Sequence, residues 1–104
     1  MQSKIQDSFK AMSDPVRREI LVMLKNGKMS AGDIASRFTL THATVSHHLN
    51  QLKKADLIFE AKVKNFVFYE LNTTVFDDLL FWMSQFKNAD ASVKDDLSVL
   101  GELQ

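Results

Sequence analysis

Residues 41–52, which read THATVSHHLNQL, carry many polar side chains but no carboxylate. In a helix, which turns by about 100° per residue, Val45, Leu49 and Leu52 fall on one side and the small or hydrogen-bonding side chains on the other. Phosphates repel carboxylates, whereas short hydroxyl, amide and imidazole groups can reach base edges. The stretch therefore predicts a helix that lies in a groove of double-stranded DNA, although a solvated polar face is the plain alternative.

The first turns of such a helix usually contact the bases. We expect five residues to read them: His42, Ala43, Thr44, Ser46 and His47. Ala43 can meet a thymine methyl group, and His47 can donate to a guanine acceptor. Contacts to the DNA backbone are assigned to polar and basic residues nearby, which would make binding depend on salt: Thr41, Asn50, Lys53, Lys54, Lys62, Lys64 and Asn65.

The adjacent His47 and His48 raise the question of a metal site. Neighbouring residues diverge by about 100° around a helix, so their rings do not converge on one tetrahedral ion. The chain has no cysteine, and no inward carboxylate completes a ligand set. We therefore predict no metal site and no cofactor, and we interpret His48 as a packed or hydrogen-bonded residue that fixes the helix.

Length and composition limit the class of protein. With 104 residues, 45% hydrophobic and 25% charged, the chain is expected to form one globular domain over residues 1–104. The absence of cysteine fits a cytoplasmic protein, and no apolar run approaches the ~20 residues of a membrane span or the core of a signal peptide. No serine-centred nucleophile motif and no glycine-rich phosphate loop occurs, so the sequence does not predict an enzyme.

The formal net charge is zero, but the charges are unevenly distributed. Residues 1–69 hold eleven Lys and Arg against six Asp and Glu, a net of +5, and residues 70–104 hold two against seven, a net of −5. The basic residues thus accompany the predicted reading helix, as DNA binding requires, unless the imbalance is ordinary scatter of surface charge.

Apolar periodicity and helix caps predict the elements that position this helix. A first helix covers residues 3–12, Ser13 or Asp14 caps a second that begins with Pro15, and the second helix stops at Asn26-Gly27, where glycine takes the left-handed conformation. Ser30 caps a third helix, and after a brief turn Thr41 caps the fourth, which gives a helix-turn-helix over residues 30–54.

The pattern becomes extended at residues 57–71, which predict a β-hairpin, or wing. At its charged tip Asn65 or Lys64 must adopt the turn conformation, and asparagine tolerates it best. A further helix, capped by Asn72-Thr73, covers residues 73–88, and a short helix is expected in the tail between Ser92 and Leu103. The fold class is mostly α with a small β-hairpin, a winged helix-turn-helix in the order α-α-α-α-β-β-α.

The last helix carries more large apolar residues than one helix face can bury in a small domain. We expect residues 3–12 and 73–88 to form the interface of a homodimer through these side chains: Ile5, Phe9, Phe76, Leu79, Leu80, Trp82, Met83 and Phe86. Dimerisation would place two reading helices about 34–36 Å apart on a roughly palindromic site. The alternative is that the stripe completes the core of the monomer.

Over residues from about 8 to 86, the chain resembles the ArsR-type winged-helix repressors. Three runs carry the resemblance: FKAMSDPVRREIL from Phe9, GDIA from Gly32 and TVSHHLNQLK from Thr44. The run YELNTTV from Tyr69, with Trp82-Met83, is similar to the SdpR-like autorepressor branch. The resemblance implies a homodimer built from the first and last helices, the fourth helix in the major groove, the wing on the minor groove or backbone, and repression of the protein's own promoter.

The chain departs from that family at its metal sites. Ser30 and Gly32 stand where many relatives carry paired cysteines, and Asp77 and Asp78 lie on the last helix without any histidine. Both family metal sites are therefore missing, and the inducer is not specified. In the wing, Asp56 and Lys64 replace the usual glycines.

Two other functions stay open. One is a repressor that senses a small molecule or metal at an unfamiliar site, such as a pocket at the dimer interface lined by Phe76, Trp82 or Phe86; ligand-dependent release from DNA would identify it. The other is a winged helix that binds a protein partner and no DNA, which would show no salt-sensitive binding to any duplex.

Overall fold

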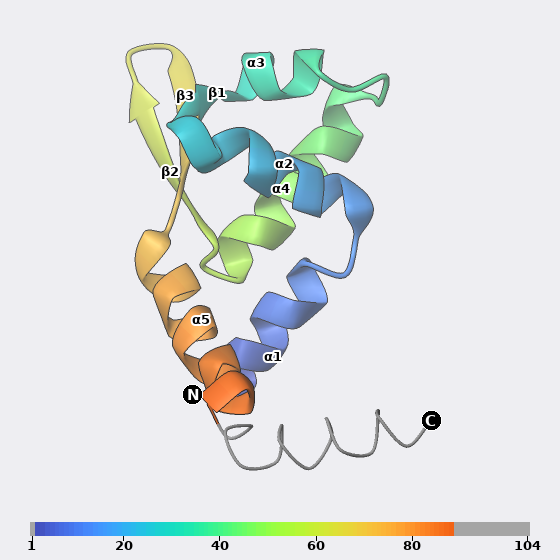
Figure 1. Ribbon diagram of the computed structural model, residues 1–104. Coiled ribbons are helices and arrows are strands. Elements are labelled where there is room, and N and C mark those ends of the chain that lie inside the picture. The colour runs from blue at the N-terminus through green and yellow to red at the C-terminus, as the bar shows by residue number, and fades with distance from the viewer. Residues whose placement is uncertain (1, 89–104) are drawn as a thin grey trace.

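The computed structural model describes residues 2–88, whose helices lie beside and below a small sheet at one edge of the molecule (Figure 1). The elements are α1 (Gln2–Ala11), α2 (Pro15–Met23), a 3₁₀ turn η1 (Leu24–Asn26), β1 (Met29–Ser30), α3 (Ala31–Ser36), α4 (His42–Lys54), β2 (Ile58–Val63), β3 (Phe66–Leu71) and α5 (Thr73–Asn88). The predicted winged helix-turn-helix is confirmed, with β1 as an additional strand. The helix predicted between Ser92 and Leu103 lies outside the described residues.

Short polar residues fix where the helices begin. Asp14 caps α2, since its Oδ1 accepts hydrogen bonds from the amides of Val16 (2.8 Å) and Arg17 (3.2 Å), and Pro15 is the first helical residue as predicted. The α-helix ends earlier than expected, at Met23, because its last turn tightens into η1. Gly27 has φ 136° and ψ 175°, so it takes the positive φ that was predicted, although its ψ differs from that of a left-handed helix; this backbone favours glycine.

The helix-turn-helix is held by two side-chain caps. The Ser30 hydroxyl accepts from the amide of Asp33 at 3.1 Å, and the Thr41 hydroxyl accepts from the amide of Thr44 at 3.1 Å. Each cap satisfies an amide that the helix itself leaves without a partner. Both predicted caps are confirmed, and they set the starts of α3 and α4.

The sheet has the order β1-β3-β2, and all its pairs are antiparallel. Val63 pairs with Phe66, so Lys64 and Asn65 form a two-residue turn. The left-handed backbone falls on Lys64, with φ 57°, and not on Asn65, which the sequence analysis favoured. Strand β1 pairs Met29 with Tyr69 and thereby ties the start of the helix-turn-helix to the wing.

The core lies between α2, α3, α4 and the base of the wing. Val45, Leu49 and Leu52 are only 1%, 2% and 0% exposed, which confirms them as the inward side of α4. They join buried residues from the neighbouring elements: Ile20, Leu24, Ile34, Leu57 and Ile58. The buried side of α4 is thus fixed by packing, and the opposite side is left to solvent.

Helices α1 and α5 converge at the end of the molecule away from α3 (Figure 1). The rings of Phe9 and Trp82 meet edge to face, with centroids 5.7 Å apart. The side-chain bond of Asn72 runs to the turn before the wing and not to α5 as predicted, since its Nδ2 donates to the carbonyl of Asp56 at 2.9 Å. Within the described part of the chain, every helix is too short or too polar to cross a membrane.

Candidate nucleic-acid interface

Helix α4 presents its predicted reading residues to solvent. His42, Ala43, Thr44, Ser46 and His47 are all exposed. The hydroxyl of Thr41 is committed to the cap and also donates to Oγ1 of Thr44 at 2.8 Å. Thr44 therefore keeps its own hydroxyl proton for an outside acceptor, whereas Thr41 has little left to offer a phosphate.

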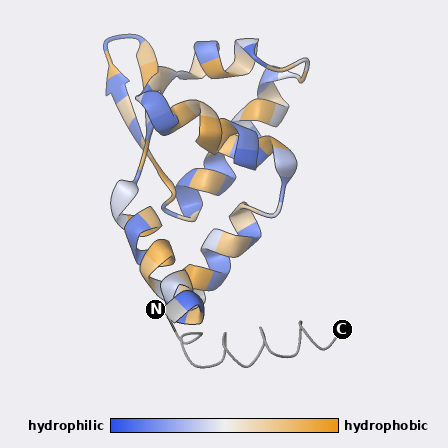
Figure 2. Ribbon diagram, viewed as in Figure 1, coloured by the Kyte–Doolittle hydropathy of each residue, from blue (hydrophilic) through white to orange (hydrophobic). Residues whose placement is uncertain are grey.

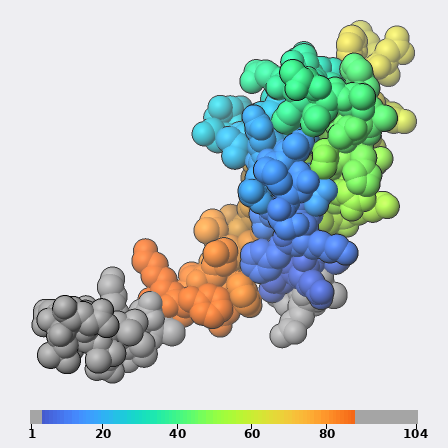
Figure 3. Space-filling view, turned by 90° about the vertical axis from the view of Figure 1, so that its right-hand side faces the viewer, coloured from blue at the N-terminus to red at the C-terminus, as the bar shows by residue number. Residues whose placement is uncertain are grey.

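The exposed surface of α4 carries no negative side chain, since His42–Lys54 contains neither Asp nor Glu. The start of α4 and the wing tip lie at one end of the molecule, and α1 lies at the other (Figures 1 and 3). A duplex bound at the end that holds the start of α4 would thus contact both the reading residues and the two lysines near the wing tip, Lys62 and Lys64.

Most residues expected to contact the DNA backbone are exposed, including Asn50, Lys54, Lys62, Lys64 and Asn65. Lys53 differs, because its Nζ lies 3.1 Å from Oε2 of Glu60 on β2. A phosphate contact by Lys53 would have to break this ion pair. The structure therefore points to Lys53 as a link between the reading helix and the wing.

Glu60 also accepts a hydrogen bond from the Tyr69 hydroxyl on β3, at 3.1 Å to Oε1. The Lys53 ammonium, assisted by this hydroxyl and opposed by partial burial, lowers the pKa of Glu60. Burial, followed by the bond to the Glu60 carboxylate, raises the pKa of Tyr69 to about 12. This cluster was not predicted from the sequence, although Glu60 is the one acidic residue between Asp56 and Glu70.

His48 is held against α2, which confirms the interpretation of it as a hydrogen-bonded residue. Its side chain is 11% exposed, and Nδ1 lies 3.2 Å from Nη1 of Arg17 and 3.9 Å from Oδ1 of Asp14. Partial burial alone would raise the pKa of Asp14, but bonds from the amides of Arg17 and Val16 hold it below its usual value. Among residues 2–88, no three His, Cys, Asp or Glu side chains are grouped to bind a metal ion.

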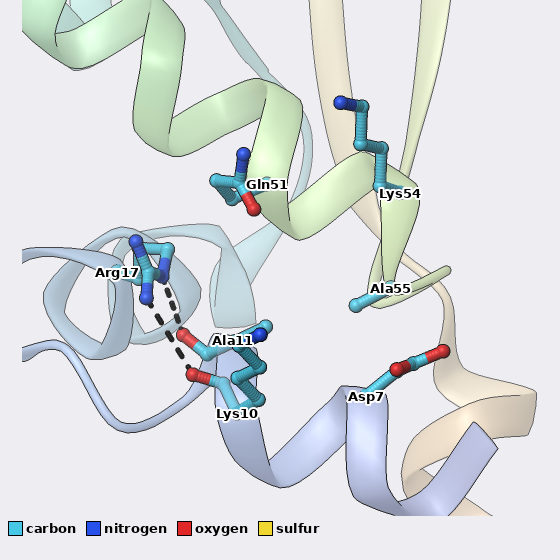
Figure 4. A pocket seen from close by; sticks show the side chains of 7 residues that line it. All are labelled: Asp7, Lys10, Ala11, Arg17, Gln51, Lys54 and Ala55. Atoms are coloured by element: carbon cyan, nitrogen blue, oxygen red, sulfur yellow. Dashed lines mark hydrogen bonds between the residues drawn. The ribbon is translucent and has the colours of Figure 1, made fainter. Parts of the chain in front are cut away.

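A polar cleft of about 240 Å³ separates α1 from α4 beside Arg17 (Figure 4). It is lined by Asp7, Lys10, Ala11, Arg17, Gln51, Lys54 and Ala55. A second, more apolar cavity of about 350 Å³ lies between α1, β2 and α5, where Ile5, Phe59, Val75 and Leu79 line it. Its lining differs from the Phe76, Trp82 and Phe86 suggested for a ligand pocket.

The residues expected at a dimer interface divide into three groups by their exposure. Phe9, Leu80, Met83 and Phe86 are 38–67% exposed, and Ile5, Phe76 and Trp82 are half-buried. Leu79 is 6% exposed and packs within the monomer core, so its side chain offers little surface to a partner. Phe81, which was not among the predicted interface residues, is 81% exposed on the same helix. Figure 2 shows the hydrophobic residues distributed along α5.

The known proteins that this chain resembles are transcriptional regulators. Residues 14–59 match the family described as bacterial regulatory protein, arsR family. The transcriptional repressor SdpR of Bacillus subtilis (strain 168) is 51% identical over 80 residues, 77% of this chain and 89% of that protein. The arsenical resistance operon repressor of Staphylococcus aureus is 35% identical over 72 residues, 69% of each chain.

Among solved structures, an ArsR-like transcriptional regulator from Rhodococcus sp. RHA1 has a TM-score of 0.79 and covers 98% of this chain and 94% of its own. At 22% identity this similarity shows the fold alone. The resemblance seen in the sequence motifs is confirmed by the match to SdpR. The chain belongs to the ArsR family of bacterial regulatory proteins and is a DNA-binding transcriptional regulator, not an enzyme.

Proposed function

We propose that this protein represses transcription, including that of its own gene, by binding a roughly palindromic DNA site as a homodimer. The observation that carries the proposal is the exposed, carboxylate-free surface of α4 above a buried apolar side. A relative that shares half of the aligned residues is named a transcriptional repressor, which supports repression over activation.

On the DNA side, we propose that His42, Ala43, Thr44, Ser46 and His47 contact base edges in the major groove. Lys54 continues the stripe of Ala43 and His47 along the helix at spacings of four and seven residues, and it would contact a phosphate. The tip lysines of the wing, Lys62 and Lys64, would hold the neighbouring backbone or minor groove.

On the opposite side, a second copy would cover the apolar stripe of α5. Leu80, Phe81, Met83 and Phe86 are all more than half exposed in the single chain. An exposed apolar group of this kind marks an interaction surface in proteins that are stable in water. We assign it to homodimerisation in the cytoplasm, with α1 completing the interface through Ile5 and Phe9.

A ligand that releases the DNA is a second candidate feature, favoured by the cavity between α1, β2 and α5. Its volume of about 350 Å³ is within the range of small-molecule sites, and Ile5, Phe59 and Leu79 give it an apolar wall. Since the cavity adjoins both the wing and the proposed interface, an apolar molecule there could favour one DNA-binding state over another. Its signature would be loss of operator binding on addition of the molecule.

The direct test is footprinting on the DNA upstream of the protein's own gene, at low and raised salt. We expect two protected half-sites that are lost together as salt rises. Protection of no sequence in preference to bulk DNA would contradict the proposal.

Two variants separate base reading from backbone contact. Lys54→Ala should weaken binding to every duplex by a similar factor and reduce the salt dependence by about two ions per dimer, one for each chain. His47→Ala should in addition change which sequence is preferred, because it removes a base contact. Equal shifts at every site in both variants would show that His47 does not read bases.

A further inference from the structure

Arg17 connects three helices. From the first turn of α2, its Nε donates to the carbonyl of Ala11 at 2.6 Å and its Nη2 to the carbonyl of Lys10 at 3.5 Å (Figure 4). Its Nη1 lies 3.2 Å from Nδ1 of His48 on α4. One guanidinium thus contacts the C-terminus of α1 and the reading helix together.

We call these contacts of Arg17 the Arg17 bridge; the carbonyls of α1 at one end and His48 at the other are both suited to accept hydrogen bonds from a guanidinium. The last carbonyls of a helix lack partners within it and carry partial negative charge, which a cation satisfies well. A guanidinium can only donate, so Nδ1 of His48 must accept, and the imidazole proton is then on Nε2. The charged groups near this ring are Asp14 and Arg17 from α2, with His47 beside it on α4.

Packing does little to fix α1 against α4 at this point, since the cleft of about 240 Å³ lies between them (Figure 4). The Lys4–Asp56 ion pair also joins α1 to the segment after α4, at 3.4 Å, but both side chains are more than half exposed. Exposed pairs of this kind contribute little. The Arg17 contact to His48 is better shielded from water, because the His48 side chain is only 11% exposed.

We propose that Arg17 is a positioning residue for DNA recognition, which fixes the orientation of α4 relative to α1. This inference rests on the proposed function, in which α1 belongs to the dimer interface and α4 reads DNA. In such a dimer the distance between the two reading helices depends on how each α4 is held to its α1, and that distance must match the groove spacing. Loss of the bridge would therefore cost sequence-specific binding in particular.

The chain contains a matched control. Arg18, the next residue, also caps the end of α1, since its Nη1 donates to the carbonyl of Met12 at 2.8 Å, but it is exposed and has no hydrogen bond to α4. Arg17→Met and Arg18→Met remove the same charge and each removes one short bond to a carbonyl at the end of α1, from Ala11 or from Met12; Arg17→Met also removes the longer bond to Lys10. Only the first removes the link to the reading helix.

The experiment measures binding of both variants to the duplex that the wild-type protein selects from a random pool, and to an unrelated duplex, after circular dichroism has confirmed folding. We expect Arg17→Met to bind the selected duplex roughly tenfold more weakly than Arg18→Met does, as for loss of one hydrogen bond to a charged group. Binding to the unrelated duplex should fall equally in both. Equal losses on the selected duplex would overturn the inference.

If Arg17→Met does not fold, the other end of the bridge decides. His48→Asn keeps an acceptor near the place of Nδ1, whereas His48→Phe keeps a ring and loses the acceptor. We expect Asn to retain sequence-specific binding better than Phe does, and the reverse order would overturn the inference. ¹⁵N NMR of the wild type should also find the His48 proton on Nε2, and a proton on Nδ1 would contradict the bridge. Failure of the wild type to select any sequence would instead reject the proposed function.

Discussion

At the scale of single residues, Glu60 links the reading helix to the wing, because its carboxylate accepts hydrogen bonds from Lys53 on α4 and from Tyr69 on β3. The chain has one tyrosine, so tyrosinate absorbance reports Tyr69 alone. With a pKa of about 12 against an ordinary 10.0, the folded protein should show little tyrosinate at about pH 11, whereas the unfolded chain should be mostly ionised.

The sign of this effect on stability follows from proton linkage. The folded state binds the Tyr69 proton more tightly, so its contribution to stability is complete below pH 10 and is lost as the pH rises through about 12. Glu60→Gln should lower the pKa of Tyr69 towards 10, because burial then acts without the carboxylate. Identical titrations of the folded variant and the folded wild type would exclude the Glu60 contact.

For single residues, the sequence predicted which side chains are exposed better than it predicted which side chains contact each other. Periodicity placed His47 and the other reading residues on the open side of α4, and it placed His48 nearer the core. It did not predict Arg17 as the partner of His48, which is 31 positions away, because a repeat within one helix carries no information about contacts between helices. The Lys53–Glu60 pair was missed for the same reason.

At the scale of elements, caps and turn residues made the helices and the wing predictable. Asp14, Ser30 and Thr41 each bond the amide that their sequence position indicated. Strand β1 was missed because two residues are too few to show alternation, and it forms only where β3 offers a free edge. The turn conformation was assigned to Asn65, but pairing of Val63 with Phe66 puts Lys64 at the strained position.

Lys64→Gly should separate stability from DNA binding. A left-handed residue other than glycine costs roughly 1–2 kcal/mol, and glycine's greater freedom in the unfolded chain offsets part of the relief, so we expect unfolding to cost about 0.5–1 kcal/mol more. DNA binding should weaken as one cation is lost. Denaturant unfolding and salt-dependent binding measure the two effects.

Lys62→Ala is the control for that substitution, because it removes the same charge from a paired strand residue with negative φ. It should weaken DNA binding similarly without the gain in stability. A Lys64→Gly protein that is less stable than the wild type would show that the turn is not strained.

At the scale of the whole molecule, some apolar residues of α5 belong to the core of the single chain and others are exposed and available for the proposed dimer interface. Phe81→Glu should leave the monomer folded, since that side chain is 81% exposed, but should disrupt the proposed dimer by placing a charge in it. Sedimentation should then find single chains, and emission from Trp82, the one tryptophan, should move to longer wavelength. Val22→Glu, on an apolar residue of α2 that is 58% exposed, should leave the mass unchanged.

The sequence alone could not divide this stripe, because the period of a helix shows which residues share a face but not how far the monomer covers it. Leu79 proved to be core, and the overlooked Phe81 proved to be the most open of the set. The uneven distribution of charge, in contrast, could be counted from the sequence, which holds a net of +5 in residues 1–69 and −5 in residues 70–104.

The central claim, that two carboxylate-free reading helices bind one duplex, is tested most directly by the mass of the protein–DNA complex. Sedimentation of the wild-type protein with its selected duplex, in dilute buffer and again at raised salt, should find two chains per duplex and dissociation as salt increases. One chain per duplex, or no complex in dilute buffer, would contradict the account.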